Sequence, residues 1–252
     1  MKTVILIPTY NEKGNIGKLI DVVQKVIKKV PKNFNAHILV IDDSSPDGTA
    51  DLVKKYTKKY KNVHLLINPK KEGLGGAYLK GMEYATKKLN AEVLMQFDAD
   101  FSHDPYKIPE FLKAINSGSD LVLGSRYIKG GTIPENWGIH RKFLSIMGNL
   151  TIRTIMMHFK IHDWTTGYRA IRKEVYDAVK NELNQERFFG YTFQIGFLLK
   201  AIRKGYKVSE VPINFIDRTY GVSKIGPEYI KNTLIYIIKT RIGEIFHVKN
   251  TD

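Results

Sequence analysis

Short apolar runs alternate with longer amphipathic segments through the first half of the chain. Runs rich in Val, Ile and Leu that are too short for helices predict strands. They lie at 3–7, 38–41, 63–67, 121–124 and in the stretch that starts at Val93. Between them, apolar residues recur at the 3.6-residue period of a helix, for example at Ile16, Leu19 and Val23. This alternation predicts an α/β fold, with helices around a doubly wound, mostly parallel sheet.

The pattern changes after about residue 130, where the sequence Gly-Gly-Thr-Ile-Pro interrupts the alternation. Residues 141–160 predict a long helix without any acidic residue, and apolar side chains cover most of its circumference. Further elements are expected from about residue 173 and at 191–204, 208–215 and 228–246. No linker divides the chain, so we expect one domain over residues 1–252, with two halves that meet at about residue 130.

The composition is that of an ordinary globular protein, with 43% hydrophobic and 26% charged residues. The absence of cysteine excludes disulfides and Cys-ligated metal sites. No apolar stretch approaches the ~20 residues of a membrane-spanning helix, and no signal-peptide pattern precedes the first strand. The sequence therefore predicts a cytoplasmic protein, or a peripheral one on the cytoplasmic side of a membrane.

The net charge is +15, from 40 basic and 25 acidic residues, and it favours anionic partners. Such partners include nucleic acids, phosphorylated metabolites and an anionic membrane surface. The chain has neither an RNP-like nor a helix-turn-helix pattern, so we do not expect it to bind nucleic acid. The glycine-rich loop at 73–76 lacks the spacing of a P-loop or a dinucleotide fingerprint, which argues against a kinase or a Rossmann dehydrogenase.

Polar residues follow three of the predicted strands at the point where each strand ends. They are Pro8 to Glu12, the pair Asp42-Asp43, and Asp98-Ala99-Asp100. Ligands of doubly wound sheets bind beyond the carboxyl ends of the strands. We therefore expect the three groups to converge on one crevice.

Asp98 and Asp100 are candidate ligands of a divalent cation. Residues two apart on a strand share a face, so their carboxylates should lie side by side and repel each other. A cation placed between them and a polyphosphate would relieve that repulsion, and Mg²⁺ or Mn²⁺ suits oxygen ligands. The alternative is that Asp-Ala-Asp only leaves a strand and precedes the helix that starts near Asp104-Pro105.

The first two strand ends offer groups that could hold a nucleoside. Glu12 and Asp43 can accept hydrogen bonds from a base or a ribose, and Tyr10 gives a flat surface beside them. The alternative is that Asp42-Asp43 belongs only to a turn, which Asp favours. A turn needs one carboxylate, so we expect Asp43 to contact a ligand.

Four basic residues are candidates for phosphate binding, namely Arg126, Arg141, Arg218 and Lys224. Guanidinium groups suit phosphates because they donate paired hydrogen bonds. Arg126 follows the strand at 121–124, which we expect beside the strand that carries Asp98, so it should face the same crevice. The alternative for each is a surface ion pair. His158 and His162 have helical metal-ligand spacing, but no carboxylate accompanies them and we do not expect a metal there.

Seven motifs together resemble glycosyltransferase family 2, and within it the dolichyl-phosphate mannose synthase group. They cover nearly the whole chain in order and include Asp-Asp-Ser-Ser-Pro-Asp-Gly-Thr, which is more specific than an isolated Asp-x-Asp. The motifs are Ile-Pro-Thr-Tyr-Asn-Glu (7–12), Ile-Asp-Asp-Ser-Ser-Pro-Asp-Gly-Thr (41–49), Gly-Leu-Gly-Gly-Ala-Tyr (73–78), Asp-Ala-Asp-Phe-Ser-His-Asp-Pro (98–105), Gly-Ser-Arg-Tyr (124–127), Thr-Thr-Gly-Tyr-Arg-Ala (165–170) and Asp-Arg-Thr-Tyr-Gly-Val-Ser-Lys (217–224).

The resemblance implies a GT-A fold in which residues 1–130 bind a nucleotide sugar and residues 131–252 bind the acceptor. The implied catalytic residues are Asp98, Asp100, Arg126 and Arg218. The implied nucleotide-sugar contacts are Pro8, Tyr10, Glu12, Ile41, Asp43, Asp98, Ala99, Asp100, Arg126, Arg218 and Lys224. The implied ligands of Mg²⁺ or Mn²⁺ are Asp98, Asp100 and Ser102, and the implied contacts of the acceptor phosphate are Arg126, Arg141 and Ser145.

The implied reaction is an inverting transfer of mannose from GDP-mannose to a dolichyl or other polyprenyl monophosphate. Alternatives are transfer of glucose or N-acetylglucosamine from a UDP-sugar to the same lipid, a non-catalytic nucleotide-sugar-binding module, and a basic nucleic-acid-binding protein. Many relatives carry transmembrane helices after this domain. Here we expect contact with an anionic membrane through interface helices at about 141–160 and 228–246, or through a separate membrane-anchoring subunit.

Overall fold

The computed structural model describes residues 1–186, 188, 191–217 and 227–248. Its strands are β1 (Lys2–Thr9), β2 (Asn35–Asp42), β3 (Val63–Ile67), β4 (Val93–Gln96), β5 (Leu121–Ser125), β6 (Arg169–Arg172) and β7 (Val208–Pro212). Its α-helices are α1 (Lys13–Val26), α2 (Thr49–Lys59), α3 (Gly73–Lys88), α4 (Ile108–Asn116), α5 (Ile139–Met156), α6 (Lys173–Asn184), α7 (Thr192–Arg203) and α8 (Pro227–Val248). Short 3-10 turns occupy Ile27–Lys29 and Pro105–Lys107.

The strands form one sheet in the order β3-β2-β1-β4-β6-β5-β7. Every neighbouring pair is parallel except those that involve β6, which runs antiparallel to both β4 and β5. The five strands predicted in the first half are all present. The mostly parallel α/β sheet predicted from the alternation of apolar runs and helices is therefore confirmed.

Strand β6 was not predicted, because its sequence Arg-Ala-Ile-Arg contains no apolar run. Pairing on both sides stabilises it as a strand, and its central residues Ala170 and Ile171 are fully buried. Its position corrects one expectation about the site. The strand that Arg126 follows is not next to β4, because β6 lies between them.

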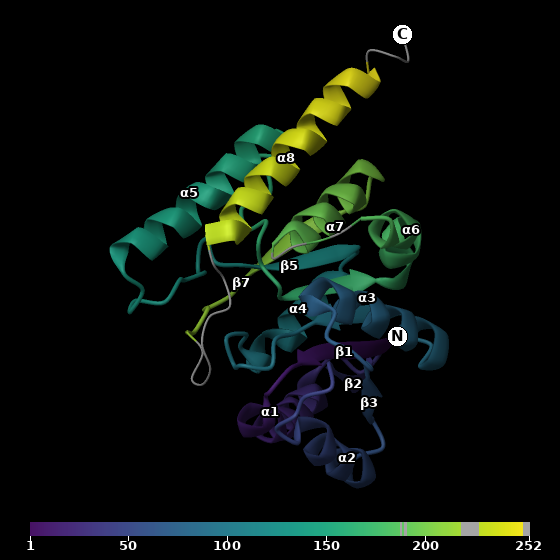
Figure 1. Cartoon of the computed structure of the whole chain (residues 1–252). Coiled ribbons are helices and arrows are strands. Elements are labelled where there is room, and N and C mark those ends of the chain that lie inside the picture. The colour runs from purple at the N-terminus through teal and green to yellow at the C-terminus, as the bar shows by residue number, and fades with distance from the viewer. Residues whose placement is uncertain (187, 189–190, 218–226, 249–252) are drawn as a thin grey trace.

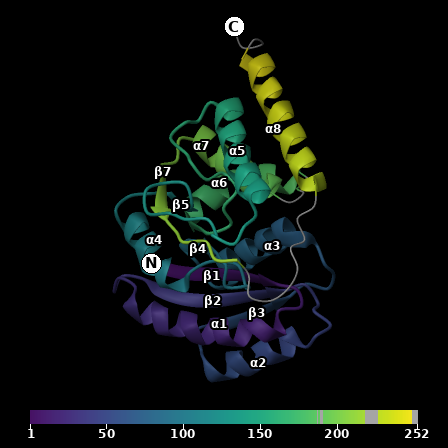
Figure 2. The ribbon, with the colours of Figure 1, turned by 90° about the vertical axis from the view of Figure 1, so that its left-hand side faces the viewer.

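Helices cover both faces of the sheet (Figures 1 and 2). Successive strand residues point to opposite faces, so Leu6 of β1 joins a core with helices α3, α6 and α7, while Ile5 joins one with α1, α2 and α4. Both side chains are fully buried. Burial of the central strands from both sides explains why these strands are apolar almost throughout.

Helices α5 and α8 lie side by side above the sheet, on the side away from α1 and α2 (Figure 1). The predicted helix at 141–160 begins at Ile139 and ends at Met156, because Met157 takes a left-handed conformation with φ of 55°. The last predicted strand ends at Pro212 and not at residue 215. Beyond it, Asn214 pairs only as an isolated bridge with Thr132.

We expect the stability of the fold to depend on pH because of two neighbouring histidines, His37 of β2 and His64 of β3. Their ring nitrogens lie 3.0 Å apart, and their rings stack with centroids separated by 5.3 Å. Burial, helped by the charge of Lys2 and by His64, lowers the pKa of His37 to about 4. Burial and Lys2 also lower the pKa of His64.

The unfolded chain binds protons at these histidines near pH 6.5, whereas the folded chain does not. The free energy of unfolding should therefore fall as the pH is lowered from about 6.5 towards 4. Urea midpoints at pH 7.5 and 5 would measure this loss, and His37→Gln should make it smaller. An equal loss in the variant would show that the pair does not cause it.

Candidate functional site

The carboxyl ends of β2, β1 and β4 lie next to one another, as the sequence predicted. Thr9 of β1 pairs in register with Asp42 of β2, and the Asp43 amide donates to the Thr9 carbonyl at 3.1 Å. On the other side, the Phe97 amide donates to the Leu6 carbonyl at 3.0 Å. The segments that begin at Tyr10, Asp43 and Asp98 thus leave the same edge of the sheet.

Asp42 and Asp43 have different environments. Asp42 is fully buried and holds the turn, because its carboxylate accepts from the Thr9 hydroxyl at 2.9 Å, the Ser45 hydroxyl at 2.7 Å and the Ser45 amide at 2.9 Å. Asp43 makes none of these contacts and instead accepts from the Asn68 side chain at 2.7 Å. The turn thus uses only Asp42, which is consistent with a ligand-binding role for Asp43.

Residues of the first loop present an aromatic face and a carboxylate. The Lys71 ammonium lies 3.9 Å from the centre of the Tyr10 ring. The carboxylate of Glu12 accepts from the Asn15 side chain at 2.8 Å. Pro8 is half-buried at the end of β1 and pairs in register with Ile41, which is fully buried in the core. Neither the side chain nor the backbone of Ile41 is exposed.

Asp98 and Asp100 lie in a turn after β4 and not on the strand itself. Strand β4 ends at Gln96, so the same-face argument that we used for the two carboxylates does not apply. The turn is closed by the Ser102 amide, which donates to Asp100 Oδ1 at 3.0 Å, and Phe101 takes a left-handed φ of 65°. Both carboxylates thus belong to one tight turn, and the charges of both act on the Tyr78 hydroxyl.

Two buried side chains hold Asp98 in place. The Tyr78 hydroxyl on α3 donates to Asp98 Oδ1 at 3.2 Å. His103 Nδ1 accepts from the Asp98 amide at 3.1 Å, and its Nε2 lies 3.6 Å from Asp98 Oδ2. Burial lowers the pKa of His103 against the opposing charges of Asp98 and Asp100.

The charges of Asp98 and Asp100 both raise the pKa values of Tyr78 and His103. Burial raises the pKa of Tyr78 well above its usual value, and the charges of Asp98 and Asp100 raise it further. Within the described ranges no three or more His, Asp and Glu side chains are placed so that they could together hold a metal ion. Two carboxylates fit a Mg²⁺ or Mn²⁺ ion that takes its remaining oxygens from water and phosphates. Ser102 is buried beside them.

Tyr78 belongs to the motif at 73–78, but nothing in the sequence assigned it a role. Its hydroxyl orients a candidate metal ligand, and partners of this kind typically change metal affinity by about 10–100-fold. Tyr78→Phe should therefore weaken Mn²⁺ binding by about that factor while the fold is retained. Titration of Mn²⁺ by electron paramagnetic resonance would measure it. Tyr84→Phe on the same helix is the control, and equal affinities in both variants would exclude this role.

The side chain of Arg126 is only 8% exposed and forms an ion pair with Asp163. Its Nε and Nη2 donate to the two carboxylate oxygens of Asp163 at 2.7 Å each, and Nη2 also donates to the Thr165 hydroxyl at 2.8 Å. Burial opposes the charge of Arg126, but Asp163 outweighs this effect and raises the pKa of the guanidinium above its usual value. Asp163 itself is fully buried, and no motif pointed to its role.

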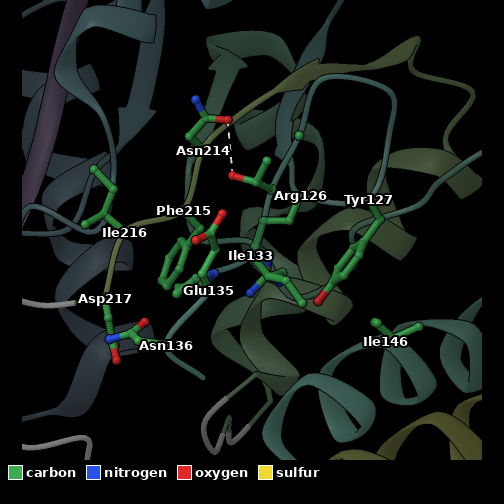
Figure 3. Close-up of a pocket in the computed structure, with 13 residues that line it drawn as sticks. Arg126, Tyr127, Ile133, Glu135, Asn136, Ile146, Asn214, Phe215, Ile216 and Asp217 are labelled. Atoms are coloured by element: carbon green, nitrogen blue, oxygen red, sulfur yellow. Dashed lines mark hydrogen bonds between the residues drawn. The ribbon is translucent and has the colours of Figure 1, made fainter. Parts of the chain in front are cut away.

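A cavity of about 860 Å³ lies between the segment after β5, helix α5 and the segment after β7 (Figure 3). Arg126, Tyr127 and Phe215 line it. Figure 3 shows the Tyr127 hydroxyl pointing towards α5, where it hydrogen-bonds to the Ser145 hydroxyl at 2.6 Å. At the same helix, Arg141 lies 3.3 Å from Asp217, which also lines the cavity.

The remaining basic candidates cannot be placed in the same way. Arg218 and Lys224 lie outside the residues that the structure describes. His158 and His162, which the sequence excluded as a metal pair, both follow the end of α5. His162 Nδ1 lies 2.7 Å from a carboxylate oxygen of Glu210, which gives it a partner of its own.

Comparison with known proteins finds relatives that match almost the whole chain. The chain is 38% identical over 237 residues to "Polyprenol monophosphomannose synthase" of Mycolicibacterium smegmatis, covering 94% of this chain and 85% of the relative. It is 35% identical over 243 residues to "Undecaprenyl-phosphate mannosyltransferase" of Micrococcus luteus, covering 95% and 93%. At such identities over nearly full length, the chains share a fold and a family.

Solved structures show the same architecture at low identity. Glucosyl-3-phosphoglycerate synthase from Mycobacterium tuberculosis, solved with Mn²⁺, uridine diphosphate and phosphoglyceric acid, superposes with a TM-score of 0.67 at 14% identity, covering 95% of this chain and 78% of that one. The same enzyme solved with Mg²⁺ and uridine diphosphate gives 0.65. At these identities the likeness concerns the fold alone.

The model of the family "Glycosyl transferase family 2" matches residues 4–180, which include most of β1, all of β2 to β6 and the strand ends described above. The family resemblance and the glycosyltransferase activity predicted from the motifs are therefore confirmed. The chain belongs to glycosyl transferase family 2.

Proposed function

We propose that this enzyme transfers mannose from GDP-mannose to a polyprenyl monophosphate such as dolichyl phosphate, with inversion at the sugar carbon. The observation that carries the proposal is the near full-length similarity to two relatives whose names describe mannose transfer to polyprenyl phosphates. The arrangement of the strand ends supports it, because the candidate nucleoside residues and the two carboxylates lie along one edge of the sheet.

The donor would lie across this edge. Tyr10, Glu12 and Asp43 would contact the nucleoside, with Pro8 and Ile41 in the same wall. Asp98 and Asp100, with Ala99 between them and Ser102 beside them, would hold Mg²⁺ or Mn²⁺, which would offset the charge of the diphosphate and stabilise it as a leaving group. We also assign diphosphate contacts to Arg218 and Lys224.

The acceptor would enter from the cavity of Figure 3. Its phosphate would approach Arg126, Arg141 and Ser145, whose neighbours Tyr127 and Asp217 line or reach that cavity. Arg126 is held by two bonds of 2.7 Å to Asp163, whereas Arg141 has one longer contact of 3.3 Å with Asp217 and is 40% exposed, so Arg141 is the more available cation.

The reaction would need no general base. An oxygen of the lipid phosphate, already an anion at neutral pH, would form the bond to C1 of the sugar. The bond from C1 to the diphosphate would break, and GDP would leave with the electron pair. The protein would mainly bring two anions together and stabilise the developing charge. The environment of His103 is consistent with a reaction without a general base, because its Nδ1 already accepts from the Asp98 amide and its Nε2 faces the Asp98 carboxylate.

The proposal is tested by incubating the purified protein with Mn²⁺, a polyprenyl monophosphate and single nucleotide sugars. GDP-mannose should give GDP and a mannosylated lipid, while UDP-glucose and UDP-N-acetylglucosamine should give little product. Preferred use of a UDP-sugar would replace the donor assigned here. Binding of a nucleotide sugar without transfer, in the presence of lipid and metal, would indicate a binding module.

Two helices would bring the enzyme to its lipid substrate. Within the described residues, no helix is both long enough and apolar enough to cross a membrane. Helices α5 and α8 pack together, with Ile152, Met156 and Ile237 buried, and this accounts for part of their apolar surface. Much of the rest is exposed. The exposed residues include Ile139, Phe143, Leu144, Ile146, Met147, Leu150, Ile230, Leu234, Ile235, Ile238, Ile242 and Phe246.

We propose that this surface lies in the interface of an anionic membrane, with lysines and arginines towards the headgroups. In flotation with vesicles that contain an anionic lipid, the protein should bind, and salt should weaken binding. Changing Ile146, Met147 and Leu150 together to Gln should reduce it further without loss of donor binding.

The control for flotation is a change of exposed apolar residues elsewhere, such as Ile67→Gln with Tyr106→Gln, which should leave vesicle binding unchanged. Absence of binding to anionic vesicles even at low salt would contradict the proposal. Attachment through a separate membrane-anchoring subunit would then be the remaining explanation for how the enzyme reaches a lipid.

A further inference from the structure

The side-chain amide of Gln194 is buried next to the two-carboxylate site without a partner. Gln194 is 2% exposed and lies in the first turn of α7. Its backbone carbonyl accepts from Arg169 Nη1 at 2.7 Å, which fixes the residue in place. Neither amide atom has a hydrogen-bond partner among the residues that the structure describes. Buried amides are normally hydrogen-bonded, so this one calls for a ligand or a water.

The unpartnered amide faces a small space beside Asp98. A Cβ placed on Gly167 would lie 3.7 Å from Gln194 Nε2, 3.7 Å from Asp98 Oδ2 and 3.5 Å from His103 Cε1. These are ordinary van der Waals distances, and the φ of Gly167 lies outside the left-handed region. Neither packing nor backbone conformation therefore requires glycine here. Its absent side chain leaves room for a group of about that size.

We propose that Gln194 binds a hydroxyl of the transferred sugar and so contributes to the choice of donor. This inference rests on the proposed function, in which the donor lies against Asp98. A carboxamide can donate and accept at once, as can a sugar hydroxyl, and it is neutral. The diphosphate would instead need lysine or arginine side chains, and neither type is among the three groups nearest the space. Gln194 would act as a positioning residue for the sugar ring.

A binding experiment can separate the contribution of the sugar to affinity from that of the nucleotide. With Mn²⁺ present, the affinities for GDP and GDP-mannose are measured by calorimetry for the wild type and for Gln194→Leu. The variant should bind GDP as the wild type does but bind GDP-mannose about 5- to 100-fold more weakly, as expected for a lost hydrogen bond that leaves a buried partner unsatisfied. Its turnover should fall as well.

A second variant tests the space without altering the amide. Gly167→Ala fills the space at ordinary contact distances, so the protein should keep its melting temperature. It should show the same selective loss of affinity for GDP-mannose. Gln96→Leu is the matched control, because Gln96 is fully buried in β4 with an unpartnered amide but is not among the groups nearest Gly167. This control should keep the wild-type ratio of the two affinities.

Donors that lack one hydroxyl identify the contact. Four GDP-deoxymannoses, each missing the hydroxyl at position 2, 3, 4 or 6, are compared with GDP-mannose. One of them should bind the wild type more weakly than GDP-mannose does. The same compound should bind Gln194→Leu as well as GDP-mannose binds that variant. If Gln194→Leu and Gly167→Ala both keep the wild-type ratio, the amide holds only a water and the inference is overturned. If the wild type prefers another nucleotide sugar, the assigned donor fails and the experiment is repeated with that sugar. If no nucleotide sugar binds, both proposals fail.

Discussion

Asp100→Asn should remove sugar transfer while the protein stays folded. Changing a residue that only orients a metal ligand typically alters metal affinity by about 10–100-fold, so losing a ligand's charge should reduce turnover by more than about 100-fold. The fold should survive because Asp100 lies in a turn at the edge of the sheet, and an Asn side chain can still accept from the Ser102 amide as Asp100 Oδ1 does at 3.0 Å.

The measurement is initial-rate transfer at several Mn²⁺ concentrations, with circular dichroism and a melting temperature to confirm folding. Asp104→Asn is a close control, since Asp104 accepts from the Tyr106 amide at 2.9 Å at the start of the next helical turn and Asn can make the same contact. Asp104→Asn should retain turnover. Transfer by Asp100→Asn at the wild-type rate, with ordinary metal dependence, would show that Asp100 is not a metal ligand.

Asp163→Asn should have the largest effect on stability. The substitution leaves the buried guanidinium of Arg126 without its carboxylate, and breaking a buried ion pair from one side typically costs about 3–5 kcal/mol. That is a large part of the stability of an ordinary domain. Urea unfolding followed by fluorescence should therefore show a much lower midpoint.

Two further variants distinguish a lost ion pair from general damage. Replacing both partners, as Arg126→Met with Asp163→Leu, removes the unpaired charge and should recover much of the loss. Glu110→Gln breaks the exposed contact between Glu110 and Lys107 and should change stability by less than about 1 kcal/mol. If Asp163→Asn is as stable as the wild type, a neighbour other than the carboxylate must satisfy the charge of Arg126.

The sequence predicted the features that depend on local pattern. Short apolar runs located β1 to β5, because strands buried on both faces must be apolar throughout. The convergence of Tyr10, Asp43 and Asp98 followed from the rule that parallel strands end at one edge. The separate role of Asp42 was also foreseen, since one carboxylate is sufficient to hold the turn.

Features that depend on distant partners could not be predicted. Strand β6 exists because two other strands pair with it, and its own four residues carry no strand pattern. Arg126 was assigned to a phosphate, but its partner Asp163 follows it by 37 residues and no periodicity connects the two. Gln194 showed no signal at all, because its position becomes informative only when Gly167 and Asp98 are placed beside it.

The position of β6 has a consequence for how the chain folds during its synthesis. Strand β4 can pair with β1 early, but its other edge stays open until residues 169–172 have emerged and closed a long loop. An unpaired central strand is a site of aggregation in that interval. A fragment of residues 1–130 should therefore not fold as an independent nucleotide-binding unit. Completion of the sheet next to the Asp98 turn would be a late event, dependent on the second half of the chain.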